Sequence, residues 1–253
     1  MTSRPQFSHP IAHRGLHNRA SGIIENSQAA FEAAIAHGFA IECDLQLSRD
    51  GVPMIFHDDE LEPLTGRPGL VGSLTAAELG KTPLLQSAAG DTPQSVADFL
   101  AQIAGRTLLQ IELKRQPDAA MGETLVRRTV EALAAYDGPV TLESFDPHLI
   151  VLARRFGFTG PLGIITYRYN NPEWDGKPTG GQRFVLRHLL HWPWTRFDFI
   201  SCYTEALDLP AVRMFRALGV PVTAWTVRTS RDRQLAQAGA DQIVFEGFDP
   251  EDG

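Results

Sequence analysis

The strongest constraint on the fold of this chain is a regular alternation of short apolar runs with longer amphipathic segments. Apolar runs of this length are typical of buried strands, and the segments between them carry apolar residues at the spacing of a helix face. Eight strands are expected, at His9–His13, Phe39–Leu47, Thr107–Lys114, Pro139–Ser144, Pro161–Thr166, Phe197–Cys202, Pro221–Val227 and Asp241–Glu246. Helices are expected at Ser27–His37, Pro93–Ala104, Ala119–Tyr136, Pro147–Phe156, Gln182–Leu190, Pro210–Leu218 and Ser230–Ala238.

Strands that alternate with helices pair in parallel, and eight such units in 253 residues predict an α/β fold of the (β/α)8 type, a TIM barrel. A doubly wound open sheet is the alternative. A nucleotide-binding sheet has no support, because neither Gly-x-Gly-x-x-Gly nor Gly-x-x-x-x-Gly-Lys-Ser/Thr follows any expected strand. No linker or change of composition interrupts the pattern, so residues 1–253 are expected to form a single domain.

The stretch Ile41–Asp58 predicts a β-hairpin arm in addition to the eight barrel strands. A tight turn at Asp50-Gly51 joins the second strand to a short apolar run, Pro53–His57. Successive side chains of a strand point to opposite faces, so Glu42 and Asp44 share a face and Cys43 points away from them. The arm would fold His57 back over this pair of carboxylates. Residues 58–92 are expected to be irregular apart from one helical turn at Thr75–Leu79.

Polar residues stand at the carboxyl ends of several expected strands, where a barrel carries its active site. The first strand ends at His13-Arg14, and Glu112 and Lys114 of the third repeat the i, i+2 spacing of Glu42 and Asp44. Glu143, Trp225 and Glu246 lie at the ends of the fourth, seventh and eighth strands.

These residue types favour metal-assisted phosphodiester chemistry. Three converging carboxylates (Glu42, Asp44 and Glu112) would repel one another, and a bound Mg²⁺ or Ca²⁺ would relieve that repulsion. Zinc is disfavoured because no histidine–cysteine cluster offers its usual ligands. Arg14 and Lys114 are suited to hold a phosphate. His13 and His57 could serve as general base and general acid, and an alkoxide leaving group requires the acid.

These motifs resemble those of the glycerophosphodiester phosphodiesterase family nearly end to end. The resemblance implies a TIM barrel that hydrolyses glycerophosphodiesters to glycerol 3-phosphate and an alcohol with a divalent metal, an activity of glycerol and lipid metabolism. It also implies that His13 and His57 are catalytic, that Glu42, Asp44 and Glu112 bind the metal, and that Arg14 and Lys114 contact the phosphate. The matching residues are His13-Arg14-Gly15, Glu25-Asn26-Ser27, Phe31, Ala34, Gly38, Glu42-x-Asp44, Asp50-Gly51, His57-Asp58, Thr65-Gly66, Glu112-x-Lys114, Ser144-Phe145 and Trp225-Thr226.

Other residues are left with two interpretations each. Glu25 and Asn26 are expected either to reach the substrate pocket or to cap the first helix. Glu143 belongs either to the pocket or to a structural salt bridge, and Trp225 either to the pocket wall or to the barrel interior. Phe245-Glu246 departs from the Thr-Asp that the family usually carries at the last strand. The remaining histidines are assigned to the surface or to packing: His9, His17, His37, His148, His188 and His191.

Composition limits the kinds of binding partner and the cellular compartment that are expected for this chain. The net charge of −7 argues against a general nucleic-acid surface, and the family resemblance implies a small glycerophosphodiester as the partner. No run of about 18 apolar residues and no apolar leader is present, so no integral membrane segment is expected. Two distant cysteines, Cys43 and Cys202, favour a reduced, cytoplasmic protein.

Two alternatives to hydrolysis remain. One is a phospholipase D-like lyase that forms a cyclic phosphate from a lysophospholipid or sphingolipid. The other is a non-catalytic barrel that binds phosphodiesters or sugar phosphates, which would have no need of two histidines placed for proton transfer.

Overall fold

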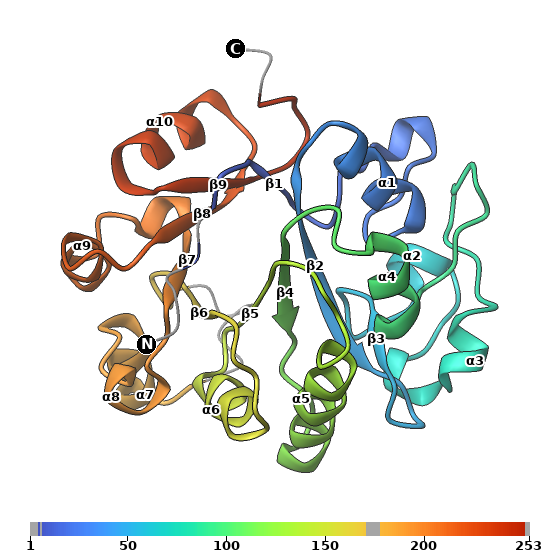
Figure 1. The fold of residues 1–253 in the computed structure, drawn as a ribbon, viewed down its shortest axis with the longest axis horizontal. Helices are drawn as coiled ribbons and strands as arrows, with labels where there is room; N and C mark the ends of the chain where they lie inside the picture. Colours follow the sequence, from blue (N-terminus) through green and yellow to red (C-terminus); the bar gives the residue numbers. More distant parts are fainter. Residues whose placement is uncertain (1–4, 6, 171–177, 251–253) are drawn as a thin grey trace.

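The fold is a closed barrel of eight parallel strands surrounded by helices, as the sequence predicts (Figure 1). The computed structural model describes residues 5, 7–170 and 178–250. Around the barrel, each strand pairs with the next and the last pairs with the first. The barrel strands are β1 (Ile11–Ala12), β2 (Ala40–Leu47), β4 (Leu109–Leu113), β5 (Val140–Ser144), β6 (Leu162–Thr166), β7 (Phe199–Tyr203), β8 (Val222–Val227) and β9 (Gln242–Phe245).

The first strand is shorter than expected, but it closes the barrel. Ile11 of β1 pairs with Ala40 of β2 on one side and with Val244 of β9 on the other. His13, expected within the strand, lies in the turn that follows it, where its backbone N–H donates to the carbonyl of Phe245. The closure therefore brings the residues after β1 next to those after β9.

The expected hairpin arm is present as β3 (Pro53–Ile55), which pairs antiparallel with the end of β2. Gly51 in the turn has a φ of +77°, which glycine adopts without the steric cost that other residues incur. In residues 58–92 the expected helical turn is present as α3 (Ala76–Leu79), and two further turns that were not expected accompany it, α2 (Glu62–Thr65) and the 3-10 turn η2 (Val71–Ser73). These turns form because they bury Leu61, Leu64 and Leu79 against Met54 and Phe56 of the arm.

The outer helices follow the expected pattern, with one exception. The helix expected at Gln182–Leu190 is α7, which ends at Arg187 because Leu189 adopts a φ of +53°, and a further helical turn, α8, follows outside the expected segment. The helices are α1 (Gln28–Ala36), α4 (Val96–Ile103), α5 (Ala119–Leu133), α6 (Pro147–Arg155), α7 (Gly180–Arg187), α8 (Trp192–Thr195), α9 (Pro210–Ala217) and α10 (Ser230–Gly239), with 3-10 turns η1 (Arg19–Ser21) and η3 (Thr204–Ala206).

The main core lies between the sheet and these helices, where Phe31 of α1 and Phe99 of α4 pack at a ring-centroid distance of 4.7 Å. Cys43 is fully buried in it, as the alternation of β2 predicts. Across the described ranges, no helix has the length and apolar character needed to cross a bilayer.

Candidate active site

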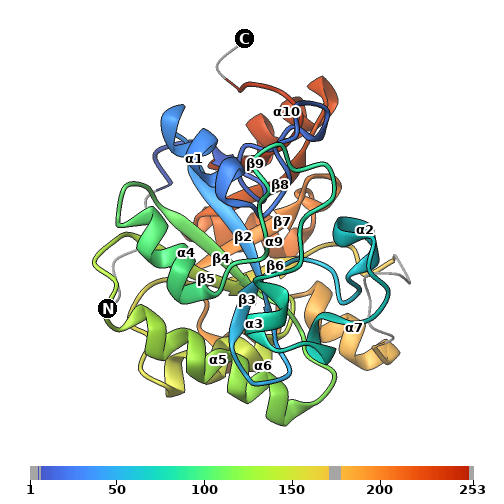
Figure 2. The same ribbon diagram turned by 90° about the vertical axis from the view of Figure 1, so that its right-hand side faces the viewer.

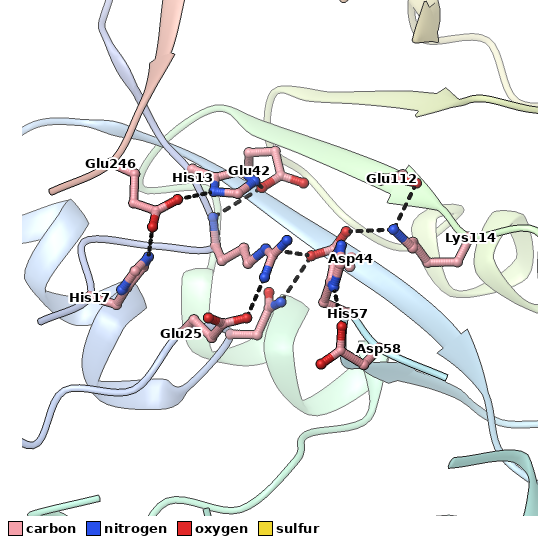
Figure 3. A network of polar contacts seen from close by, with 12 residues as sticks. His13, His17, Glu25, Glu42, Asp44, His57, Asp58, Glu112, Lys114 and Glu246 are labelled. Atoms are coloured by element: carbon pink, nitrogen blue, oxygen red, sulfur yellow. Dashed lines mark hydrogen bonds and ion pairs between the residues drawn. The ribbon is translucent and has the colours of Figure 1, made fainter. Parts of the chain in front are cut away.

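Three carboxylates meet at the carboxyl ends of β2 and β4. Asp44 lies directly opposite Glu112 in the parallel register, and Glu42 precedes Asp44 by two residues on the same face. One carboxylate oxygen from each of the three lies within 4.8 Å of the others, and all three residues are buried (Figure 3). The predicted convergence of these side chains is therefore present.

The proton affinities of the three differ because their neighbours differ. Burial, followed by the charges of Asp44, Glu143 and Glu112, raises the pKa of Glu42 well above its usual value. Burial also raises the pKa of Glu112. It opposes ionisation of Asp44 too, but the charges of His57, Lys114 and Arg14 outweigh burial and hold the pKa of Asp44 below its usual range. The cluster thus combines one stable anion with two carboxylates whose charge needs compensation.

This donor set fits a hard divalent cation. Oxygen ligands from carboxylates are those that Mg²⁺ and Ca²⁺ prefer, and a cation between them would remove the repulsion that raises the pKa values of Glu42 and Glu112. Glu42 and Asp44 of β2 and Glu112 of β4 lie on neighbouring strands of a rigid barrel. The cluster is therefore a candidate metal centre with its ligands already assembled.

Two cationic side chains border the carboxylates. Lys114 Nζ lies 3.1 Å from Glu112 Oε1 and 3.5 Å from Asp44 Oδ1. Arg14 Nε lies 3.5 Å from Asp44 Oδ2, and a further guanidinium nitrogen donates to Glu25. Both cations are mostly buried at the mouth of the barrel, which is where a phosphate would meet them.

His13 is held by a carboxylate from the opposite end of the chain. Its Nδ1 lies 2.8 Å from Glu246 Oε2, which also accepts from Arg228 Nη2 at 2.6 Å. Burial alone would raise the pKa of Glu246, but these two hydrogen bonds keep it below its usual range. An ionised carboxylate only accepts, so Nδ1 carries the proton and Nε2 is left as the basic nitrogen. This Nε2 lies 4.0 Å from Glu42 Oε2.

His57 has the same arrangement on the other side of the carboxylates (Figure 3). Its Nδ1 lies 2.7 Å from Asp58 Oδ1, and that contact lowers the pKa of Asp58. Burial lowers the pKa of His13 to about 4, although its bond with Glu246 acts in the opposite sense. Both imidazoles therefore have Nδ1 directed at a carboxylate, and both line the same cavity.

The cavity has a volume of about 1210 Å³ and an aromatic wall. Trp225 is part of this wall, with ring centroids 5.5 Å from Phe145 and 5.4 Å from Tyr203. Tyr167 and Tyr169 continue it, with their ring centroids 4.3 Å apart. Trp174, which the sequence places in the same loop, lies outside the described residues.

The remaining residues with two interpretations are now placed. Ser27 caps α1 by accepting from the backbone N–H of Ala30, so Asn26 is not the cap. Asn26 instead adopts a φ of +53° and donates from Nδ2 to Asp44 Oδ2 at 3.0 Å. Glu143 lines the cavity beside Glu112 and makes no salt bridge within the described ranges; burial raises its pKa to about 8.

A model of the glycerophosphoryl diester phosphodiesterase family matches residues 13–249. The chain belongs to this family. A glycerophosphodiester phosphodiesterase from Caldanaerobacter subterraneus is 38% identical over 250 residues, covering 95% of this chain and 94% of that protein. A putative glycerophosphodiester phosphodiesterase from Bacillus subtilis is 34% identical over 244 residues, covering 92% of each.

The fold is also shared with solved structures. A phosphodiesterase from Oleispira antarctica, in complex with the product sn-glycerol-3-phosphate, has a TM-score of 0.76 and 24% identity, over 95% of this chain and 93% of that one. A putative glycerophosphoryl diester phosphodiesterase from Silicibacter pomeroyi has a TM-score of 0.75 and 23% identity, over 95% and 90%. At these identities the comparison establishes the barrel.

Three neighbours of the histidines in this phosphodiesterase-family chain were not singled out from sequence. Arg228 and His17 both approach Glu246, His17 Nε2 at 3.9 Å from Oε1. Asp58 was visible only as the residue after His57 in the motif. Glu246 itself was noted as a departure from the family, and that was the one available signal that the mouth of the last strand has a particular role.

Proposed function

We propose that this chain hydrolyses glycerophosphodiesters to glycerol 3-phosphate and an alcohol, using a divalent cation and two histidines. The observation that supports this most directly is the pair of imidazoles, each with Nδ1 on a carboxylate and each lining the cavity that contains the acidic cluster. A binding protein would have no use for two imidazoles oriented in this way, because proton transfer is what the orientation serves.

Glu42, Asp44 and Glu112 would hold the cation. When bound, it supplies Lewis-acid polarisation of the phosphoryl oxygens and compensates charge that develops during the reaction. Arg14 and Lys114 bind the phosphate from the sides, Arg14 with a planar fork and Lys114 as a point charge. Asn26 and Glu25 keep Asp44 and Arg14 in place through the contacts described above.

His13 and His57 divide the proton transfers between them. One takes a proton from the attacking water, or from the substrate's own 2-hydroxyl, and the other donates a proton to the leaving alkoxide. Glu246 and Asp58 fix the tautomer in which Nε2 is the exchanging nitrogen. The assignment of acid and base depends on which histidine lies next to the departing oxygen.

The test is turnover of a panel of glycerophosphodiesters, including glycerophosphocholine, with and without EDTA. His13→Ala and His57→Ala are each expected to lose about 100-fold or more in kcat, the usual range for general acid–base catalysis. Circular dichroism controls for folding. Turnover near that of the unmodified protein in a folded variant would refute the role of that histidine. A persistent cyclic phosphate in ³¹P NMR spectra would indicate the lyase instead of the hydrolase.

We propose a reduced, cytoplasmic location and a small-molecule partner. Both cysteines are free and buried, so neither depends on an oxidising compartment. The cavity, lined by carboxylates, cations and aromatic rings, has the character of a small-molecule site.

A further inference from the structure

The stretch from Pro178 to Phe197, which contains α7 and α8, differs from the rest of the surface. Eight large apolar side chains are exposed among the described residues, and four of them lie in this stretch of the chain: Phe184, Leu190, Trp192 and Trp194. Trp194 and Phe184 are 59% and 57% exposed. Isolated exposed apolar residues are ordinary, but a concentration of two tryptophans, a phenylalanine and a leucine marks a binding surface.

Helix α7 is loosely packed against the part of the chain that the structure describes. None of its residues is buried, although it carries Phe184, Val185 and Leu186 in succession. A helix of eight residues is too short to be stable in water without tertiary contacts. In Figure 2 it lies at the periphery of the barrel, where a second surface could cover it.

The charges of the same stretch all have one sign. Arg183, Arg187 and Arg196 are exposed, and no aspartate or glutamate occurs from Pro178 to Phe197, in a chain whose net charge is −7. Exposed arginines interspersed with exposed Trp, Phe and Leu are a composition that partitions into the interface of an anionic bilayer. Tryptophan favours this interface because its ring is apolar and its N–H is polar.

The stretch also borders the catalytic cavity. Val185, Leu186 and Trp194 line it, together with Pro147 and Val151 of α6. Apolar side chains of this stretch are thus part of the cavity lining, and Trp194 is both a lining residue and an exposed one. A bilayer in contact with Phe184 and Trp194 would lie at the rim of the cavity.

We propose that the exposed residues of α7 and α8 (Arg183, Phe184, Arg187, Leu190, Trp192, Trp194 and Arg196), here termed the α7–α8 face, bind an anionic lipid bilayer. The apolar side chains enter the interface and the arginines contact acidic headgroups. The chain is then a peripheral membrane protein with its cavity rim at the lipid surface. This proposed binding to a bilayer does not depend on the proposed hydrolysis of glycerophosphodiesters.

The experiment is co-sedimentation of the full chain with vesicles of phosphatidylcholine alone or with about one-third phosphatidylglycerol. Binding is expected only to the anionic vesicles, and high salt should weaken it because screening reduces surface attraction. Phe184→Ser with Leu190→Ser should lower the partition coefficient about tenfold or more, since burial of each side chain is lost. Arg183→Gln with Arg187→Gln should lower it for anionic vesicles alone.

Leu70→Ser is the matched control, because Leu70 is 53% exposed but lies opposite Glu60 in an antiparallel bridge, away from α7 and α8 in the sequence. It should bind vesicles as the unmodified chain does. Turnover of water-soluble glycerophosphocholine should be unchanged in all variants, which shows that they fold and separates this test from that of the reaction. Absence of binding by the unmodified chain, or equal binding by the double serine variant, would overturn the proposal. So would a dimer in light scattering that the serine variant dissociates, since the face would then join two copies of the chain.

Discussion

At the scale of single residues, the site depends on carboxylates that contact the histidines. Glu246 replaces the residue that the family usually carries after the last strand, and it reaches His13 Nδ1 at 2.8 Å. Its longer side chain also accepts from Arg228. Glu246 therefore provides an anion at a position where it can hold the imidazole.

Glu246→Gln should reduce kcat by roughly 10- to 1,000-fold with little change in KM. An amide offers His13 no charge and an ambiguous hydrogen bond, so the tautomer with a basic Nε2 is no longer fixed. Steady-state kinetics on glycerophosphocholine measure the effect, and Glu246→Asp, which keeps the charge, should recover part of the loss. A glutamine variant with unaltered kcat would show that Glu246 does not position His13.

His191 should make folding stability depend on pH. It is buried, with Nδ1 3.2 Å from Thr195 Oγ1, and burial lowers its pKa to about 4 from the usual value of 6.5. Between these values the unfolded state binds a proton that the folded state does not. The free energy of unfolding is therefore unaffected above the unfolded pKa and falls as the pH falls below it, by up to ~1.4 kcal/mol per pH unit.

Replacing His191 with Leu should make this slope shallower between pH 6.5 and pH 5, as measured by urea unfolding at several pH values. A slope remains in the variant, because burial also lowers the pKa of His13. Identical slopes for the two proteins would mean that His191 gains its proton before unfolding.

At the scale of elements, the loop between β1 and α1 must bring His13 and Arg14 to the site while packing closely on the helix. Gly15 makes this possible, with a φ of +79°. A Cβ at this position would lie 2.9 Å from the backbone carbon of Ala30. The turn in the hairpin arm has a glycine with nearly the same φ, Gly51, but the nearest atom to its added Cβ is 3.6 Å away.

Gly15→Ala should therefore destabilise the protein more than Gly51→Ala. The left-handed conformation costs about 1–2 kcal/mol in each variant, and the contact with Ala30 adds roughly 1–3 kcal/mol at Gly15 alone. Urea unfolding gives the difference. Gly15→Ala should also lower kcat, because α1 and the loop that carries His13 must move apart, whereas Gly51→Ala should not. Equal destabilisation would mean that the loop yields without strain.

At the scale of the whole molecule, the proposed metal centre would couple metal binding to stability. Its ligands come from β2 and β4, which are adjacent only in the folded barrel, so a cation bound there stabilises the folded state. At a metal concentration 100 times Kd, the stabilisation is about 2.7 kcal/mol. For a chain of this size that corresponds to an increase in Tm of about 5–10 °C.

Thermal unfolding with Mg²⁺, with Ca²⁺ and with EDTA should reveal this increase. Glu42→Gln should reduce it, and excess metal should restore it only in part. Comparison of the two cations identifies the one that the site prefers. A Tm that is identical in all three solutions would contradict a metal centre at these carboxylates.

The sequence by itself determined the barrel, the hairpin arm and the residues that meet at the mouth. The periodicity of strands and helices can be recognised within windows of a few residues. In a strand, the i, i+2 spacing of Glu42 and Asp44 places both side chains on the same face. The motif that contains His57 and Asp58 is equally local. Such features need no knowledge of distant parts of the chain.

Only the tertiary structure decided what each of these residues contacts. The bond between His13 and Glu246 joins residues 233 positions apart, and it exists because β1 pairs with β9 when the barrel closes. From sequence, Asn26 could be either a helix cap or a pocket residue. In the folded chain its side-chain amide donates to Asp44. The end of α7 at Arg187 and the exposure of apolar residues in α7 and α8 also depend on what packs against them. Local patterns specify which face a side chain points to, but register and closure determine which partner it finds there.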